Sequence, residues 1–289
     1  MIGVTKFRAG LVQLRSGRRV VENLAKAESL IRRAAEGGAI YVQTPENTGL
    51  MELKPELVLA AAETEERSAP LAHFRALAGE LGIVLHIGSL AIKLDQERVA
   101  NRSYLIGPEG TIVARYDKLH MFDVDLPGGE SYRESQYFRP GSKAVVADLP
   151  FGRLGFSICY DLRFPALYRA LAAAGAELIA VPSAFTRQTG EAHWRVLVRA
   201  RAIETGAFVL AATQGGLHEN GRATYGHSIV VSPWGEVLAE GGEEPGVVFA
   251  DIDLAASQEA RARIPALKHG RSFEVEVASA QPSEVKEAS

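Results

Sequence analysis

Residues 153–165 read RLGFSICYDLRFP, and this stretch indicates the fold class. The run 153–158 predicts a strand that ends at Cys159, and Pro165 stands near the first position of a helix predicted over 165–174, with Gly175 as its stop. A strand that passes through a short turn into a helix is typical of α/β proteins, whose sites form at the carboxyl ends of strands. Cys159 occupies such a position.

Strand-like and helix-like segments alternate on both sides of this unit. Gly107-Pro108-Glu109-Gly110 is a hairpin signal, so antiparallel strands are added to the strand-helix units and the sheets should be mixed. On the helix predicted over 191–204, Ala192, Val196, Ala200 and Ile203 form one face. The predicted helices are 20–34, 71–81, 165–174 and 191–204, and the predicted strands are 7–14, 39–43, 83–94, 99–106, 111–116, 153–158, 177–181, 207–213, 225–231, 237–240 and 247–253.

The 289 residues contain no internal repeat and no linker, so we predict one domain over 1–275, followed by a polar tail over 276–289. Two sheets, each covered by helices on one side and packed together on the other, would account for this content. We expect the tail to be loose or to lie on a partner subunit.

Charge and hydropathy exclude several classes of function. There are 32 basic and 35 acidic side chains, giving a net charge of -3, which argues against a nucleic-acid binder or a polybasic membrane-surface protein. No uncharged apolar run approaches the ~18 residues that span a bilayer, and the first residues do not resemble a secretory signal. We therefore expect a cytoplasmic protein.

The chain has one cysteine, Cys159, which excludes an internal disulfide and a cysteine-based zinc site. No other metal or phosphate motif is present, so no metal is expected. Cys159 is either a buried packing residue or a catalytic thiol, and the nearby helix N-terminus would favour its thiolate. His120, His193 and His227 could each be its partner in a papain-like pair, and spacing does not decide this.

Two more ionisable residues follow predicted strands. Glu46 lies directly behind Pro45 after the strand 39–43, where it is either a surface turn residue or a general base whose pKa is raised toward neutrality. Lys118 follows the strand 111–116 and precedes three apolar residues. It either extends to water or is desolvated and acts through its charge.

Three segments together resemble, in order and spacing, the Glu, Lys and Cys motifs of the nitrilase, or carbon-nitrogen hydrolase, superfamily. The resemblance runs from about Phe7 to about Arg271, and its motif segments are 44–47 (TPEN), 116–124 (YDKLHMFDV) and 158–165 (ICYDLRFP). Further segments resemble the Nit branch, which contains the deaminated glutathione amidases and the omega-amidases, with the former closer. These are 182–186 (PSAFT), 189–194 (TGEAHW), 199–204 (RARAIE) and 225–228 (YGHS).

The resemblance implies a fold and a reaction. The fold is a four-layer αββα sandwich with two mixed sheets and outer helices, assembled as a homodimer or a higher homo-oligomer. The reaction is hydrolysis of a linear amide of a small carboxylate-bearing substrate to acid and ammonia through a thioester on Cys159, with water as the second reactant and no cofactor. Glu46 would be the general base, while Lys118 and the backbone N–H of Tyr160 would stabilise the oxyanion.

The resemblance also implies supporting residues. Glu134 would orient Lys118 or the substrate, with a loop salt bridge as its alternative. Arg163, with Phe185 and Thr189, would line the acyl pocket and bind a substrate carboxylate, unless Arg163 only pairs with Asp161 to hold the turn. Omega-amidase and nitrilase activity remain alternatives of the same mechanism. A catalytically silent binding protein is the alternative from another class, and it gives no reason to retain the three motif residues.

Overall fold

The computed structural model describes residues 5–278 and contains two six-stranded sheets. The first sheet has the order β16-β1-β2-β3-β4-β5 and the second the order β15-β14-β11-β10-β9-β8. In each sheet three central strands are parallel and the flanking strands are antiparallel, so the mixed sheets expected from the hairpin signals are confirmed. The strands of the first sheet are Lys6–Gln13 (β1), Tyr41–Gln43 (β2), Val84–Lys93 (β3), Val99–Ile106 (β4), Ile112–Asp117 (β5) and Gly246–Asp253 (β16).

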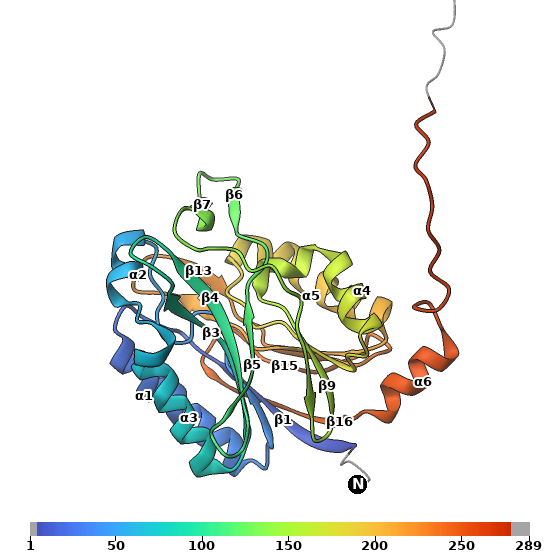
Figure 1. Ribbon diagram of the computed structural model, residues 1–289, viewed down its shortest axis with the longest axis horizontal. Coiled ribbons are helices and arrows are strands. Elements are labelled where there is room, and N and C mark those ends of the chain that lie inside the picture. The colour runs from blue at the N-terminus through green and yellow to red at the C-terminus, as the bar shows by residue number, and fades with distance from the viewer. Residues whose placement is uncertain (1–4, 279–289) are drawn as a thin grey trace, which may run out of the picture.

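Besides the second sheet, two small hairpins lie outside the main layers. Its strands are Val146–Leu149 (β8), Gly152–Phe156 (β9), Leu178–Ala180 (β10), Phe208–Ala211 (β11), Ile229–Val231 (β14) and Val237–Glu240 (β15). The hairpins are Asp123–Asp125 (β6) with Ser131–Arg133 (β7), and Gly215–Leu217 (β12) with Ala223–Tyr225 (β13). The β6–β7 hairpin stands out from the layers at the upper edge of Figure 1.

Helices cover the outer face of each sheet, which completes the four-layer αββα sandwich (Figure 1). Helices α1 and α3 share an apolar cluster with the first sheet, and α4 and α5 pack on the second. The helices are Val20–Glu36 (α1), Pro55–Ala61 (α2), Ala69–Leu81 (α3), Pro165–Ala173 (α4), Arg187–Thr205 (α5) and Ala255–Arg263 (α6). The predicted fold class is therefore confirmed.

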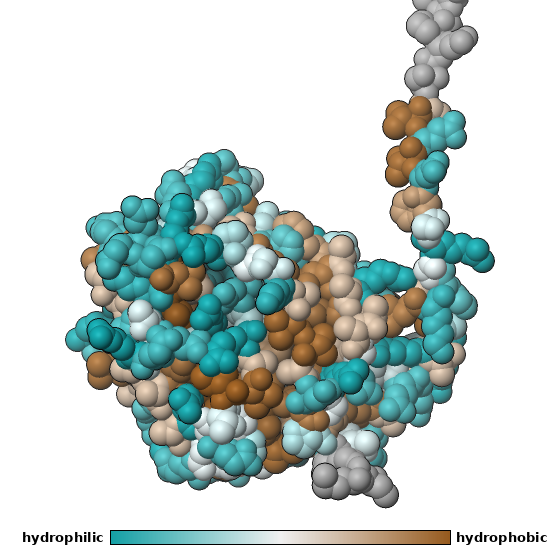
Figure 2. All heavy atoms as spheres, viewed as in Figure 1, coloured by the Kyte–Doolittle hydropathy of each residue, from teal (hydrophilic) through white to brown (hydrophobic). Residues whose placement is uncertain are grey.

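The main core lies between the two sheets. Leu11 and Tyr41 of the first sheet and Phe156 and Ile179 of the second are fully buried in one cluster. Figure 2 shows hydrophobic side chains between β5 and β9, at the edge where the two sheets meet, and polar side chains over the β6–β7 hairpin. Burial of apolar surface on both faces of each sheet stabilises the layered arrangement.

The buried face of helix α5 differs from the face that the sequence predicts. The predicted apolar face lies outward, with Val196 69% and Ile203 55% exposed, while Trp194, Val198 and Ala202 pack against the sheet. The helix also begins one turn earlier than predicted, where the side chain of Thr186 caps Thr189 N–H. Trp194 is the largest apolar side chain of the helix, and the face that buries its indole is the face that packs on the sheet.

Three further features complete the fold. Helices α2 and α6 and the short strand β8 were not predicted. Residues 279–289 of the predicted tail lie outside the described residues, and the boundary near residue 275 stays a prediction. Within residues 5–278 no helix combines the length and apolar character needed to cross a membrane.

Candidate active site

Strand ends from both sheets meet at one pocket. Glu46 follows β2, Lys118 follows β5 and Cys159 follows β9, and the carboxyl ends of these strands lie at the same edge of the sandwich. The three side chains are buried, with exposed fractions of 3%, 2% and 6%. They line a pocket of ≈ 270 Å³ together with every other residue predicted for the site, namely Glu134, Tyr160, Arg163, Phe185 and Thr189.

The loop that carries Glu46 is fixed by contacts with β3. A side chain at Gly88 would place its Cβ 2.2 Å from the carbonyl oxygen of Thr44, so only glycine allows this approach. Asn47, with φ 58°, takes a left-handed conformation, and its N–H donates to Ser89 Oγ at 2.9 Å. These contacts turn the Glu46 carboxylate into the pocket, so it is not a surface turn residue.

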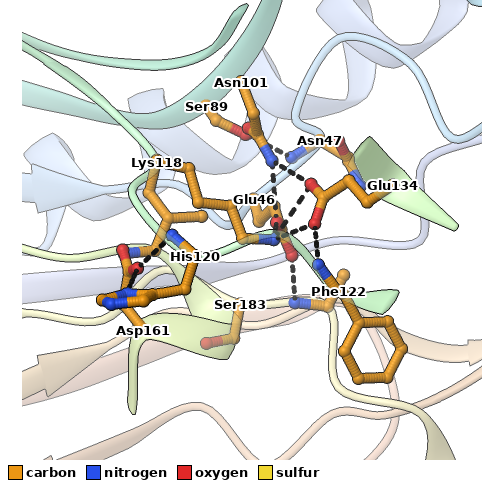
Figure 3. Close-up of polar contacts among 12 residues, drawn as sticks. Glu46, Asn47, Ser89, Asn101, Lys118, His120, Phe122, Glu134, Asp161 and Ser183 are labelled. Carbon is orange, nitrogen blue, oxygen red and sulfur yellow. Dashed lines mark hydrogen bonds and ion pairs between the residues drawn. The ribbon is translucent and has the colours of Figure 1, made fainter. Parts of the chain in front are cut away.

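The ammonium group of Lys118 bridges two carboxylates (Figure 3). Its Nζ donates to Glu46 Oε1 at 2.8 Å and to both oxygens of Glu134 at 3.0 and 2.9 Å. Glu134 begins the 3₁₀ turn Glu134–Gln136 (η2) and also accepts from Phe122 N–H at 2.7 Å. Lys118 therefore does not extend to water, and Glu134 contacts Lys118 as the resemblance implies.

Asn101 of β4 contacts both carboxylates. Its Nδ2 donates to Glu46 Oε1 at 2.9 Å and to Glu134 Oε1 at 3.1 Å, while the N–H of Ala184 donates to Glu46 Oε2 at 3.1 Å. The Oδ1 atom of Asn101 is buried without a partner among the described residues. Sequence reasoning missed Asn101 because an asparagine inside a strand gives no local sign of its neighbours.

The buried charges of Glu46, Lys118 and Glu134 determine the protonation states of Glu46 and Lys118. Burial raises the pKa of Glu46, but the ammonium of Lys118 outweighs burial and holds that pKa below its ordinary value. Burial lowers the pKa of Lys118, yet the carboxylates of Glu134 and Glu46 hold it well above its ordinary value. The expectation that the environment raises the pKa of Glu46 toward neutrality is therefore wrong. At neutral pH both groups are charged.

Cys159 begins the 3₁₀ turn Cys159–Arg163 (η3) in a left-handed conformation, with φ 49°. Such backbone strain in a residue other than glycine gathers at functional sites. Burial and the negative charge of Glu46 raise the pKa of the thiol above its ordinary value. The expectation that a helix N-terminus favours the thiolate is thus wrong, because α4 begins only at Pro165 and a carboxylate is the nearer influence.

Asp161 holds the turn that carries Cys159. Its buried carboxylate accepts from Tyr116 Oη at 2.6 Å, from the N–H of Ile158 at 2.8 Å, and from the N–H and Nδ1 of His120 at 3.0 and 2.7 Å. These bonds join the Cys159 turn to the segment that follows Lys118. Arg163 therefore does not pair with Asp161, which removes the alternative interpretation of Arg163.

Arg163 lies at the pocket wall instead. Its guanidinium is 5.4 Å from the ring centre of Phe185 and 5.9 Å from that of Tyr160, and it contacts His193 Nδ1 at 3.3 Å. Phe185 rests on the buried indole of Trp194, with ring centres 4.9 Å apart. This wall offers a cation with aromatic neighbours to a bound molecule.

The three histidines considered as partners of Cys159 are engaged elsewhere. His120 pairs with Asp161, His193 contacts Arg163, and His227 Nδ1 contacts the carbonyl oxygen of Tyr225 at 2.7 Å. None of them lines the pocket. The titratable group that lines the pocket beside Cys159 in place of a histidine is the carboxylate of Glu46. Within residues 5–278 no group of three or more His, Cys, Asp or Glu side chains is placed to hold a metal ion.

Comparison with known proteins agrees with this geometry. The family model described as carbon-nitrogen hydrolase matches residues 8–262. A deaminated glutathione amidase from Yersinia enterocolitica is 39% identical over 90% of this chain and 92% of its own length. An omega-amidase from Homo sapiens is 37% identical over 93% of this chain and 96% of its own.

Solved structures extend this likeness to the fold. The NitFhit protein of C. elegans has a TM-score of 0.85 and 36% identity, covering 93% of this chain and 66% of that chain. A variant of the amidase from Nesterenkonia sp. AN1, with the acetamide moiety of fluoroacetamide added covalently at its active-site cysteine, has a TM-score of 0.76 and 30% identity over 92% and 97% of the two chains. The chain belongs to the carbon-nitrogen hydrolase family, in the Nit branch of the nitrilase superfamily.

Proposed function

We propose that this hydrolase cleaves the amide of a small carboxylate-bearing acid through a thioester on Cys159. The observation that carries the proposal is the convergence of a buried thiol, an ionised carboxylate and a buried ammonium on one small pocket with Arg163 at its wall. The deaminated glutathione amidases among the relatives support this class of substrate, and the omega-amidase provides the alternative.

Acylation begins with the Cys159 thiol beside Glu46. As Sγ attacks the amide carbonyl carbon, Glu46 accepts the thiol proton, and the carbonyl oxygen becomes an oxyanion. Lys118 and the N–H of Tyr160, which donates to no other backbone group among the described residues, stabilise that oxyanion. Glu46 then gives the proton to the leaving nitrogen, and the C–N bond breaks. The leaving group is ammonia from a primary amide and an amine from a secondary one.

Deacylation uses the same residues in reverse. Water enters beside the thioester, and Glu46 accepts one proton from it as its oxygen attacks the acyl carbon. The second oxyanion forms at the position of the first, and its collapse breaks the C–S bond and returns the proton to Cys159. Lys118 keeps its charge throughout because its pKa is held well above the ordinary value, so it acts through its charge. Glu134 and Asn101 hold Lys118 and Glu46 in place.

Replacement of the nucleophile tests the proposed reaction. Cys159→Ala and Cys159→Ser should abolish acid formation from deaminated glutathione and from an omega-amide of a keto acid, while circular dichroism shows an intact fold. Turnover by Cys159→Ala would refute the mechanism.

Replacement of Arg163 tests its proposed role in binding the substrate carboxylate. Arg163→Lys should lower kcat/KM for carboxylate-bearing amides about 10-fold more than for neutral amides, because a lysine cannot form a bidentate pair. An equal effect of Arg163→Lys on both kinds of amide would refute this role.

We also propose a homodimer. An outward apolar surface, defined by Val196, Ile203, Trp234 and Ile264, supports this because all four side chains are more than half exposed. Exposed apolar patches of this kind mark interfaces. Light scattering tests the homodimer.

We also propose a cytoplasmic location, because the single cysteine is a free buried thiol. The net charge of -3 fits small-molecule substrates better than nucleic acid or membrane partners. Cell fractionation tests the location.

A further inference from the structure

The two groups proposed to stabilise the oxyanion lie on different segments of the chain. Lys118 follows β5 of the first sheet, whereas Tyr160 lies in the turn η3, which follows β9 of the second sheet. Both donors must point at one oxygen atom from about 3 Å, because stabilisation of an oxyanion depends on that geometry. The proposed reaction therefore needs a contact that fixes one segment against the other.

The side chain of His120 joins these two segments (Figure 3). Its Nδ1 lies 2.7 Å from Asp161 Oδ1, and its backbone N–H donates to the same oxygen at 3.0 Å. Since an ionised carboxylate only accepts, Nδ1 carries the proton of this bond. His120 comes two residues after Lys118, and Asp161 directly follows Tyr160. The two bonds thus connect the segments beside both oxyanion donors.

Aromatic rings strengthen the same contact. The imidazole of His120 stacks on Phe164 at the end of η3, with ring centres 3.5 Å apart and an angle of 6° between the ring planes. The ring of Phe122 meets that of Tyr160 with 5.2 Å between ring centres. The two segments therefore interlock through one hydrogen-bonded carboxylate and two aromatic pairs.

The strained backbone of η3 explains why the turn needs this support. Cys159 has φ 49°, a conformation that costs about 1–3 kcal/mol in a residue other than glycine. Rotation of Cys159 toward an ordinary conformation would turn the peptide plane that carries the N–H of Tyr160. Asp161 resists such rotation, because it accepts from the N–H of Ile158 next to the turn and from His120 on the other segment.

We propose that His120 is a positioning residue, which fixes the N–H of Tyr160 relative to the ammonium group of Lys118 so that both donors meet one oxyanion. The side chain of His120 does not line the pocket, so it acts on the substrate only through these two donors. This assignment rests on the proposed function, and it adds the residue that aligns the oxyanion site.

Two reactions of Cys159 separate alignment of the oxyanion site from reactivity of the thiol. With p-nitrophenyl acetate, Sγ attacks the carbonyl carbon, an oxyanion forms, and its collapse breaks the C–O bond to release p-nitrophenolate. With methyl methanethiosulfonate, Sγ forms an S–S bond as methanesulfinate leaves, and no oxyanion forms. The thiol loses its proton in both reactions, and both report on Cys159 alone because the chain has one cysteine. Their rate ratio thus isolates the oxyanion site.

Substitution of His120 should change this ratio. His120→Phe keeps a ring on Phe164 but removes the donor, and it should slow acylation by the ester at least about 10-fold more than reaction with the thiosulfonate. His120→Asn places an amide N–H at the position of Nδ1 and should recover most of the ratio. An unchanged ratio in His120→Phe, or no recovery in His120→Asn, would overturn the assignment.

Two further variants guard this comparison. His73→Phe is the matched control, because His73 of α3 also contacts a carboxylate, with Nε2 3.1 Å from Glu28 Oε2, and an aromatic ring, that of Phe74; its ratio should equal that of the wild type. Circular dichroism checks that each variant is folded. Phe164→Leu removes the stacked ring and should lower the ratio in the same direction, so it replaces His120→Phe if that variant does not fold.

The ester and the amides together separate this role from the proposed chemistry. If wild-type protein hydrolyses no amide but His120→Phe lowers the ratio, the proposed reaction fails and the positioning role stands. If amides are hydrolysed and the ratio does not change, the reaction stands and the positioning role fails. Failure of the ester to acylate the wild-type protein would overturn both. In Cys159→Ala protein, His120→Phe should change the Kd of an amide by less than about 2-fold, because His120 acts on the transition state.

Discussion

At the scale of single residues, Cys159 combines burial with the negative charge of Glu46, and both raise the pKa of the thiol from its ordinary value of 9.0. The resting enzyme therefore contains a neutral thiol beside a carboxylate. Proton transfer accompanies attack on the substrate, when Lys118 can offset the new oxyanion. This differs from cysteine sites in which a cation maintains a stable thiolate.

The protonation state of Cys159 can be measured directly because the chain has one cysteine. The difference in absorbance at 240 nm between wild-type protein and Cys159→Ser should stay flat from pH 6 to about 9, since the thiolate forms only above the ordinary thiol pKa. A step between pH 6 and 8 would show a stabilised thiolate and contradict the account. Urea-unfolded protein, titrating near the ordinary value, provides the control.

Asn101 donates a hydrogen bond to Glu46 and should therefore influence the acid limit of activity. The pKa of Glu46 is held below its ordinary value of 4.5, so the required carboxylate is present at neutral pH and is lost only as the pH falls through that lowered pKa. Asn101→Leu removes one donor to the carboxylate and should raise this pKa by about one unit, since a hydrogen bond to a charged group contributes about 1.5 kcal/mol.

The pH profile of kcat/KM checks this prediction. Its acidic limb should move to higher pH in Asn101→Leu, and kcat should fall because the Glu46 carboxylate loses a contact that orients it. A variant with lower kcat but an unshifted acidic limb would show that Asn101 acts on the position of the carboxylate and not on its charge.

At the scale of elements, the turn η3 depends on one buried acceptor. Asp161 accepts bonds from four donors on three residues, and it connects the end of β9 to the segment after β5. Asp161→Ala should lower the free energy of unfolding by about 3 kcal/mol, because it leaves buried donors unpaired. Urea unfolding measures this change.

A surface aspartate provides the matched control for that experiment. Asp148→Ala removes a mostly exposed carboxylate whose one ion pair among the described residues is with Arg153, so it should change stability by less than about 1 kcal/mol. Equal losses in the two variants would mean that the buried bonds of Asp161 do not stabilise the turn.

Local sequence signals predicted elements well where a segment alone determines its structure. The bounds of β4 and β15 agree with the prediction, because alternating or apolar runs there end at clear turn residues. The prediction of which face of α5 is buried was wrong, because helical spacing identifies an apolar face without saying which surface covers it. The β6–β7 hairpin and α2 lack a strong periodic pattern, so the sequence did not reveal them.

The residues of the site also divide into those that a local sequence pattern predicts and those that only long-range packing brings to the pocket. Glu46, Lys118 and Cys159 could be found because each follows a strand end and lies in a recognisable motif. Asn101 and Arg222 lie in a strand and in a hairpin turn far away in the sequence, and only the packing of the two sheets brings them to the pocket. Long-range contacts of this kind leave no local pattern.

At the scale of the whole molecule, the outward face of α5 should form the subunit interface. Ile203, Trp234 and Ile264 border one hollow of ≈ 190 Å³ on this surface. Ile203→Asp places a charge beside this hollow and should shift the protein from dimer to monomer in light scattering, because a charge buried without a partner in an interface is costly. Val21→Asp, at an 80% exposed site on α1, should remain dimeric. A wild-type monomer, or dimeric Ile203→Asp, would contradict the proposed interface.

The central claim is that Cys159 carries the acyl group during amide hydrolysis, and intact-protein mass spectrometry tests it most directly. Wild-type enzyme quenched with acid during turnover should carry one acyl group per chain, on the peptide that contains the only cysteine. Cys159→Ala should carry none and form no product. Product formation by Cys159→Ala, or an acyl group on any other residue, would contradict the account.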